Sequence, residues 1–165
     1  SKYLNVSYAT TTSSCTGALH LGLLACGIGK GDEVIVPEIT WVATASAVAY
    51  TGATPVFCDI EESSWCLNIQ SAENLISSKT KAIIPVHLYG HPADMPEIML
   101  LAKKNGLYVI EDAAPSIGSE IAGKKTGSFG HISGFSFQGA KILVTGEGGM
   151  LVSNDEDIFN KAKLY

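Results

Sequence analysis

The hydrophobic residues of this chain fall into short continuous runs separated by longer stretches with a helical pattern. The runs are typical of buried strands and predict strands at Tyr8–Thr10, Glu33–Val36, Thr54–Asp59, Lys81–Val86, Leu107–Ile110, Ile132–Phe137 and Met150–Ser153. The stretches between them predict helices at Ala18–Ala25, Trp41–Tyr50, Ser71–Ser78 and Pro96–Asn105, and a last helix capped by residues 154–156. Glycines stand where several of these helices should end: Gly27 or Gly29, Gly52 and Gly106.

Strands that are apolar almost throughout, and that alternate with helices, indicate a mostly parallel sheet covered on both faces. We therefore predict an α/β fold, a three-layer α/β/α sandwich around a sheet of about seven strands. Ligands of such sheets bind outside the carboxyl ends of the strands, in the loops that lead to the helices. The loops of interest are therefore 11–17, 37–41, 87–94, 112–118 and 138–149.

Composition narrows the range of partners. The 165 residues are 46% hydrophobic and 16% charged, as in a globular domain that buries a substantial core. The net charge is −5 and no run of Lys or Arg occurs, so nothing favours a nucleic acid or an anionic membrane. No apolar stretch approaches the roughly 18 to 20 residues that span a bilayer, and no signal-peptide pattern is present. The expected partner is a small molecule.

The cysteines and the chain ends bear on location and completeness. The four cysteines lack the spacing of metal or redox sites, so we expect reduced thiols in a cytoplasmic protein. The chain has no initiator Met, and both ends read as ongoing elements. We therefore expect a segment of a longer protein.

The stretch Gly134–Met150 joins an apolar strand to a glycine-rich turn and contains a single lysine, Lys141. A lysine at the end of a buried strand is costly to desolvate, and such amines often act as nucleophiles. Lys141 is therefore a candidate catalytic residue, although a lysine that extends into solvent gives the same local pattern. The glycines at 146, 148 and 149 indicate a tight turn into the last strand.

The polar loop Ser13–Gly17 opens a helix, so free backbone N–H groups and the helix dipole face whatever lies in front of it. The loop matches neither G-x-x-x-x-G-K-[ST] nor G-x-G-x-x-G. It still predicts a phosphate site, with an ordinary Ser/Thr helix cap as the alternative.

Two further loops carry candidate chemistry. Trp41 follows a strand and is placed either to stack on a flat ring or to fill the core. Glu111 and Asp112 directly follow another apolar strand, where successive side chains face opposite ways, so only one can enter a site. Asp112, followed by the small Ala113 and Ala114, is the better candidate. The alternative is that both carboxylates cap the next helix or turn.

Other common sites are not supported. His87 and His91 are separated by Gly90 and followed by Pro92, so they cannot share a helix face as zinc ligands do, and we predict no metal site. No G-x-S-x-G motif is present, and Ser136 has no nearby histidine for a nucleophilic triad. What remains is an anion site, a stacking platform, a carboxylate and an amine. This set meets the needs of pyridoxal 5′-phosphate.

Longer motifs resemble the DegT/DnrJ/EryC1/StrS family of sugar aminotransferases, within the fold-type I pyridoxal-phosphate enzymes. The resemblance covers essentially the whole chain, in order, and rests on S-S-C-T-G-A-L-H-L (13–21), G-I-G-K-G-D-E-V-I-V-P (27–37), T-W-V-A-T-A (40–45), T-G-A-T-P-V-F-C-D-I (51–60), K-A-I-I-P-V-H-L-Y-G (81–90), E-D-A-A (111–114), G-S-F-G (127–130), F-S-F-Q-G-A-K (135–141) and T-G-E-G-G-M (145–150). It implies that residues 1–165 form an incomplete cofactor-binding large domain, without the N-terminal segment and the C-terminal small domain.

The resemblance also implies roles for single residues. Lys141 is similar to the lysine that forms an imine with the cofactor and carries protons, and Asp112 to the partner of the pyridine nitrogen. The implied phosphate ligands and ring platform are Thr16, the amide of Gly17, Ser136 and Trp41. Two positions depart from the family pattern: Cys15 stands where glycine is usual and could crowd the phosphate site, and Pro115 stands where a residue able to touch the cofactor hydroxyl is common.

The implied reaction moves an amino group from an amino acid, glutamate in most of the family, to the keto group of a nucleotide-linked sugar. The implied context is the biosynthesis of deoxyamino sugars for polysaccharide or lipopolysaccharide, by a cytoplasmic homodimer. In the family, a smaller domain and the second subunit complete the site, so we expect the chain alone to be weak or inactive.

Two alternatives remain. The first is another fold-type I activity, such as a lyase; the sugar dehydratases of the family replace the lysine, so Lys141 argues against that branch. The second is a non-catalytic, regulatory or truncated cofactor-binding module.

Overall fold

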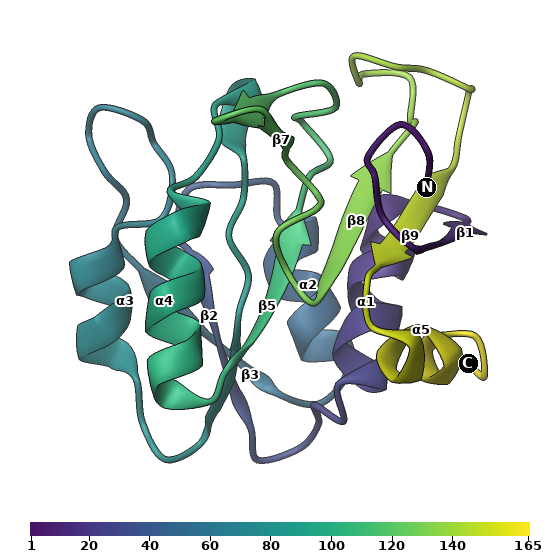
Figure 1. Ribbon diagram of the computed structural model, residues 1–165. Helices are drawn as coiled ribbons and strands as arrows, with labels where there is room; N and C mark the ends of the chain where they lie inside the picture. Colours follow the sequence, from purple (N-terminus) through teal and green to yellow (C-terminus); the bar gives the residue numbers. More distant parts are fainter.

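A computed structural model describes all residues, 1–165, and shows one seven-stranded sheet between two layers of helices (Figure 1). The strands of this sheet are β1 (Tyr8–Thr12), β2 (Glu33–Pro37), β3 (Thr54–Cys58), β4 (Thr80–Ile83), β5 (Tyr108–Asp112), β8 (Ile132–Ser136) and β9 (Gly149–Ser153). Their order is β1-β9-β8-β5-β4-β2-β3. The five strands from β8 to β3 are parallel, and β9 is antiparallel to both of its neighbours. The predicted fold class is confirmed.

The helices divide between the two faces of the sheet. They are α1 (Cys15–Ala25), α2 (Ala43–Tyr50), α3 (Ile69–Leu75), α4 (Met95–Asn105) and α5 (Glu156–Ala162). Helices α1, α2 and α5 cover one face, whereas α3 and α4 cover the other (Figure 1). None of the five has the length and apolar content needed to cross a bilayer.

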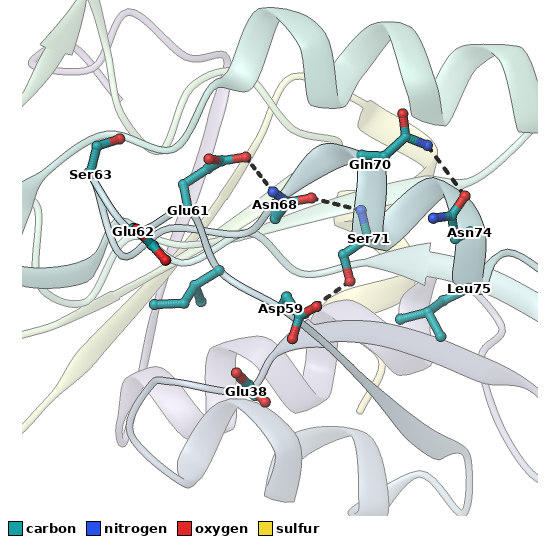
Figure 2. A pocket seen from close by; sticks show the side chains of 11 residues that line it. Glu38, Asp59, Glu61, Glu62, Ser63, Asn68, Gln70, Ser71, Asn74 and Leu75 are labelled. Carbon is teal, nitrogen blue, oxygen red and sulfur yellow. Dashed lines mark hydrogen bonds between the residues drawn. The ribbon is translucent and has the colours of Figure 1, made fainter.

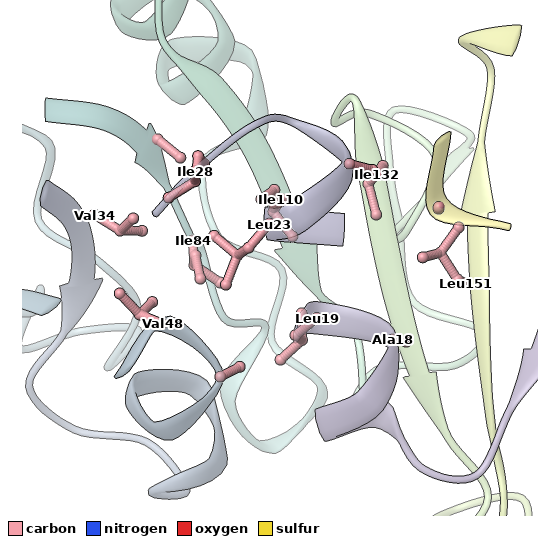
Figure 3. Packing of buried hydrophobic residues seen from close by; sticks show 14 of the residues in the cluster. Ala18, Leu19, Leu23, Ile28, Val34, Val48, Ile84, Ile110, Ile132 and Leu151 are labelled. Carbon is pink, nitrogen blue, oxygen red and sulfur yellow. The ribbon is translucent and has the colours of Figure 1, made fainter. Parts of the chain in front are cut away.

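Alternation along the central strands supplies both hydrophobic cores. In β5, Ile110 packs in the core under α1, α2 and α5, whereas its neighbour Val109 packs in the core under α3 and α4. Figure 3 shows the first core, in which Leu19 and Leu23 of α1 share a cluster with Ile110 and Ile132 of the sheet. Each fully buried side chain of this size contributes about 1.5 to 3 kcal/mol. Burial on both faces explains why the central strands are apolar throughout.

Several helix starts differ from the predicted ones, and side-chain caps set two of these starts. Ser14 and Asn68 accept the backbone N–H groups of Gly17 and Ser71, so α1 and α3 begin earlier than predicted. Helix α2 begins at Ala43, which leaves Trp41 in the preceding loop. Asp155 caps α5, as predicted, by accepting the N–H of Ile158.

Three short elements were not predicted. Strands β6 (Glu120–Ile121) and β7 (Lys124–Lys125) form a separate hairpin, and the 3-10 turn η1 covers Leu88–Gly90. Two-residue strands are too short to show an alternating pattern, so the hydrophobic periodicity could not reveal them.

Gly149, the first residue of β9, lies against the N-terminus of α1. A Cβ atom on Gly149 would lie 2.3 Å from the carbonyl carbon of Ser14 and 2.6 Å from the nitrogen of Cys15. The preceding Gly146 and Gly148 have φ values of 92° and 139°, as the predicted tight turn into the last strand requires. The absence of a side chain at position 149 therefore lets α1 begin close to the sheet.

We predict that Gly149→Ala lowers the free energy of unfolding by about 2 kcal/mol or more, because backbone atoms of α1 would have to move. Gly139→Ala is the matched control, since a Cβ there meets nothing within 4 Å and its change should stay within about 0.5 kcal/mol. Urea unfolding of both variants checks the prediction, and equal stabilities would contradict it.

Candidate functional site

The loop after β2, the carboxyl ends of β5 and β8 and the N-terminus of α1 meet at one cavity of about 440 Å³. Five of the predicted site residues line it: Thr16, Trp41, Asp112, Ser136 and Lys141. An adjoining cavity of about 490 Å³ shares part of this lining, including Asp112 and Lys141. The structure therefore brings together residues that are up to 125 positions apart (141 − 16) in the sequence. The sixth predicted residue, Gly17, is not part of the lining.

The N-terminus of α1 has features of both alternatives that the sequence left open, a helix cap and a phosphate site. The N–H of Gly17 donates to the hydroxyl of Ser14 at 3.1 Å, as in an ordinary helix cap. The N–H groups of Cys15 and Thr16 have no partner within the chain, and the side chains of Thr16 and Ser136 line the same cavity. Free N–H groups at a helix start, with hydroxyls beside them, suit a phosphate.

Lys141 is less enclosed than the sequence predicted. Strand β8 ends at Ser136, and Lys141 lies in the turn that follows, where its backbone N–H donates to the carbonyl of Gln138 at 2.9 Å. Its side chain is half-buried and lines both cavities. The lysine therefore faces the site from a turn, and not from the end of a buried strand.

Asp112 lines the same two cavities, and the alternation of side chains along β5 places it there. It is 5% exposed and faces the side of the sheet that Ile110 also faces. Its carboxylate accepts the hydroxyl proton of Thr44 at 2.8 Å and the N–H of Ala114 at 3.2 Å. Its neighbour Glu111 points to the other side, so one carboxylate of the pair enters the site, as predicted.

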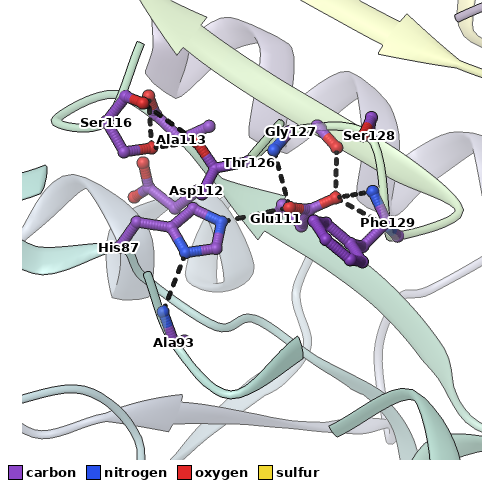
Figure 4. A network of polar contacts seen from close by, with 12 residues as sticks. His87, Ala93, Glu111, Asp112, Ala113, Ser116, Thr126, Gly127, Ser128 and Phe129 are labelled. Atoms are coloured by element: carbon purple, nitrogen blue, oxygen red, sulfur yellow. Dashed lines mark hydrogen bonds and ion pairs between the residues drawn. The ribbon is translucent and has the colours of Figure 1, made fainter. Parts of the chain in front are cut away.

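Glu111 is fully buried and anchors two loops (Figure 4). Its carboxylate accepts five hydrogen bonds, from His87 Nε2 (3.0 Å), the N–H groups of Gly127 (2.7 Å), Phe129 (2.7 Å) and Gly130 (2.6 Å), and the hydroxyl of Ser133 (3.0 Å). The carboxylate therefore holds the loop after β4 and the loop before β8 against β5.

The tautomer of His87 and the charge of Glu111 follow from these contacts. His87 Nδ1 accepts the N–H of Ala93 at 3.1 Å, so Nε2 carries the proton that is donated to Glu111 (Figure 4). Burial acts to raise the pKa of Glu111, but the hydrogen bonds from His87, Gly130 and Gly127 outweigh it and leave the pKa below its usual value. Glu111 is therefore a buried, ionised carboxylate.

We predict that Glu111 makes the free energy of unfolding depend on pH in the acid range. Because its pKa is lowered on folding, its contribution is present above the unfolded value of 4.5 and is lost as the pH falls through the lower folded value. Glu111→Gln should cost about 3 kcal/mol or more at pH 7, since an amide cannot accept all five bonds, and should flatten the loss of stability below pH 4.5.

Urea unfolding between pH 3 and pH 7 measures both effects. Glu73→Gln is the control, because Glu73 forms an exposed ion pair with Lys104 and should change stability by less than about 1 kcal/mol. A Glu111→Gln variant with the stability and pH profile of the unmodified protein would contradict the prediction.

The structure decides between the two alternatives for Trp41. It also shows how Cys15 and Pro115, the two departures from the family pattern, are placed. Trp41 is 75% exposed, which excludes a role in the core. The thiol of Cys15 lies 3.8 Å from Asp112, and burial, followed by the charge of Asp112, raises its pKa well above the usual value. The thiol stays protonated and packs toward the sheet. Pro115 lines the adjoining cavity and offers no hydrogen-bond donor.

Sequence reasoning missed two residues at the site. Thr44 is fully buried, and its contact with Asp112 links positions 68 apart in the sequence, which no spacing rule anticipates. Tyr89 is 83% exposed, lines the adjoining cavity and has a φ of 52°. A non-glycine residue in the left-handed region leaves no sequence signal, but it often marks a functional site.

A larger hollow of about 880 Å³ lies elsewhere, between β3 and α3 (Figure 2). Four carboxylates line it, from Glu38, Asp59, Glu61 and Glu62, and of these only Glu61 accepts a hydrogen bond from a side chain of the lining, that of Asn68. This surface would repel a phosphate-bearing ligand. No group of three or more His, Cys, Asp or Glu residues is placed to hold a metal ion.

Comparison with known proteins places the chain among aminotransferases. Residues 1–165 match the sequence model of the DegT/DnrJ/EryC1/StrS aminotransferase family. The chain is 54% identical over 157 residues to GDP-perosamine synthase of Escherichia coli O157:H7, covering 95% of this chain and 43% of that protein. It is 52% identical over 159 residues to UDP-N-acetyl-3-dehydro-alpha-D-glucosamine 3-aminotransferase of Acidithiobacillus ferrooxidans, covering 96% and 43%. The chain thus spans less than half the length of these relatives.

Solved structures agree with this assignment. An aminotransferase from Psychrobacter cryohalolentis superposes with a TM-score of 0.97 at 44% identity, covering 99% of this chain and 42% of the other. NtdA from Bacillus subtilis, with the cofactor PMP bound, superposes with a TM-score of 0.91 at 38% identity, covering 98% and 36%.

Proposed function

The chain belongs to the DegT/DnrJ/EryC1/StrS aminotransferase family, and we propose that it forms the cofactor-binding large domain of a pyridoxal 5′-phosphate-dependent sugar aminotransferase. One observation carries the proposal. A single cavity is lined by an amine, a carboxylate, an exposed aromatic ring and the hydroxyls beside a free helix start: Lys141, Asp112, Trp41, Thr16 and Ser136. These are the groups that this cofactor needs.

The donor set fits the phosphate of the cofactor. The free N–H groups of Cys15 and Thr16 and the hydroxyls of Thr16 and Ser136 would bind its oxygens. We propose that Gly17 contributes only if its N–H turns from Ser14 to the phosphate. A dianion at the start of an 11-residue helix also gains from the helix dipole.

The remaining residues would position and activate the reacting groups. The bound cofactor supplies a ring that withdraws electrons from the reacting carbon. Trp41 would cover one face of the ring, and the negative charge of Asp112 would keep a proton on the ring nitrogen. The Nζ atom of Lys141 would attach the cofactor and then, once displaced by substrate, move a proton as base and acid.

We propose an amino acid, glutamate by family resemblance, as amino donor and a nucleotide-linked keto-sugar as acceptor. The names of both relatives support this class, because one is a GDP-sugar synthase and the other aminates a UDP-linked dehydro-sugar. A screen of amino donors against GDP- and UDP-linked keto-sugars with the purified protein tests the class. Amination of free keto acids alone would contradict it.

We also propose that the protein works as a homodimer in the cytoplasm. Three apolar side chains directly after Lys141, those of Ile142, Leu143 and Val144, are exposed at the edge of the site, together with Trp41 and Tyr89. Trp41, Tyr89 and Ile142 line one cavity, and exposed apolar side chains gathered in this way are typical of an interface. Light scattering at micromolar protein tests the dimer, and a stable monomer would contradict it.

We predict that the protein with added pyridoxal 5′-phosphate turns yellow, and that borohydride fixes the cofactor to Lys141. Lys141→Ala should lose the fixed cofactor completely, because no other amine lines the cavity. Lys103→Ala, an exposed lysine on α4, is the control and should label like the unmodified protein. Absorbance and peptide mass mapping provide the readouts.

These readouts also separate the alternatives. A protein that binds the cofactor without a bond to Lys141 would favour a non-catalytic binding module, and a protein that stays colourless would contradict the cofactor itself. Binding is the more direct test, because the chain spans less than half of its relatives and turnover is expected to need the rest.

A further inference from the structure

The carboxylate of Asp112 is held by donors from three different segments. Its Oδ2 atom accepts the hydroxyl proton of Thr44 at 2.8 Å. Its Oδ1 atom accepts the N–H of Ala114 at 3.2 Å and lies 3.8 Å from the thiol of Cys15. The contact with Thr44 is the shortest of the three and the only one to Oδ2. The thiol of Cys15 adds little, because sulfur is a weak donor.

The hydroxyl of Thr44 belongs to a short directed chain. Thr44 is the second residue of α2 and is fully buried. A carboxylate only accepts hydrogen bonds, so the single hydroxyl proton of Thr44 is committed to Asp112. Thr40, whose hydroxyl lies 3.4 Å from that of Thr44, must then act as the donor between the two. Thr40 therefore donates to Thr44, and Thr44 donates to Asp112.

The same segment carries the aromatic platform. Trp41 stands three residues before Thr44, and residues 40–44 run from the rim of the adjoining cavity into the start of α2. One short segment thus sets the position of the ring that would cover the cofactor face and of the hydroxyl that fixes the carboxylate at the cofactor edge.

We propose that Thr44 is a positioning residue, whose hydroxyl holds the Asp112 carboxylate in the orientation that meets the ring nitrogen of the cofactor. The proposal rests on the proposed cofactor. The terminal torsion of an aspartate has a broad energy profile, so without a donor on Oδ2 the carboxylate turns more freely. The contact with the ring nitrogen weakens, while the phosphate and lysine contacts remain.

The test compares pyridoxal 5′-phosphate with 1-deazapyridoxal 5′-phosphate, in which carbon replaces the ring nitrogen. Dissociation constants for both compounds are measured by absorbance titration of the purified protein and of Thr44→Val, Thr44→Ser and Thr51→Val. Thr51 lies at the other end of α2, where its hydroxyl bonds the carbonyl of Val48, so Thr51→Val is the matched control.

We expect Thr44→Val to weaken binding of pyridoxal 5′-phosphate about tenfold, which corresponds to about 1.4 kcal/mol. Thr44→Ser, which keeps the hydroxyl, and Thr51→Val should stay within about twofold. The deaza compound, which has no ring nitrogen for Asp112 to meet, should bind Thr44→Val and the unmodified protein equally well. The ratio of the two affinities within one variant is insensitive to partial unfolding.

Other outcomes overturn the inference. An equal loss for both compounds would show that Thr44 only supports the fold, and no loss for either would show that its hydroxyl does not position Asp112. An unmodified protein that binds neither compound would instead overturn the proposed function, and the inference with it.

Discussion

The buried charge of Glu111 is the interaction on which the geometry of the site depends. Removing a carboxylate from water costs several kcal/mol unless hydrogen bonds replace the lost solvation, and here five donors do so. Four of the donors come from the loops that follow β4 and precede β8, and the fifth, Ser133, lies in β8 itself. Strand β8 carries Ser136 and leads to Lys141, so the charge of Glu111 on the far face of the sheet helps to hold the strand that precedes the turn of the lysine.

The alternation of side chains along β5 places a structural carboxylate on one face of the sheet and the carboxylate of the proposed site on the other. Glu111 and Asp112 are adjacent and therefore face opposite sides, one into the loop network and the other toward α1 and α2. A shift of one residue in the register of β5 would exchange them and place the acceptor of five bonds in the cavity. The parallel pairings of β5 with β4 and β8 fix this register. Together with the pairings of β2, they bring the ends of β2, β5 and β8 to the same edge as the start of α1.

Much of this arrangement could be predicted because burial on both faces leaves a strong signal. The central strands are continuous apolar runs, and the predicted anion, ring, carboxylate and amine positions share a cavity. Local patterns do not encode side-chain contacts between distant segments, which is why Thr44 was missed. The half-exposed position of Lys141 was also missed, since it depends on β8 ending at Ser136. The hairpin of β6 and β7 was missed because two-residue strands are too short to show an alternating hydrophobic pattern.

An experimental structure of the protein with pyridoxal 5′-phosphate tests the proposed site most directly. We expect Nζ of Lys141 to be bonded to the cofactor, the phosphate to lie at Thr16 and Ser136, and an Asp112 oxygen to lie about 2.7 to 2.9 Å from the ring nitrogen. Glu111 should keep its five donors on the opposite face. A cofactor bound in the acidic hollow between β3 and α3, or with its ring nitrogen away from Asp112, would contradict the proposed site.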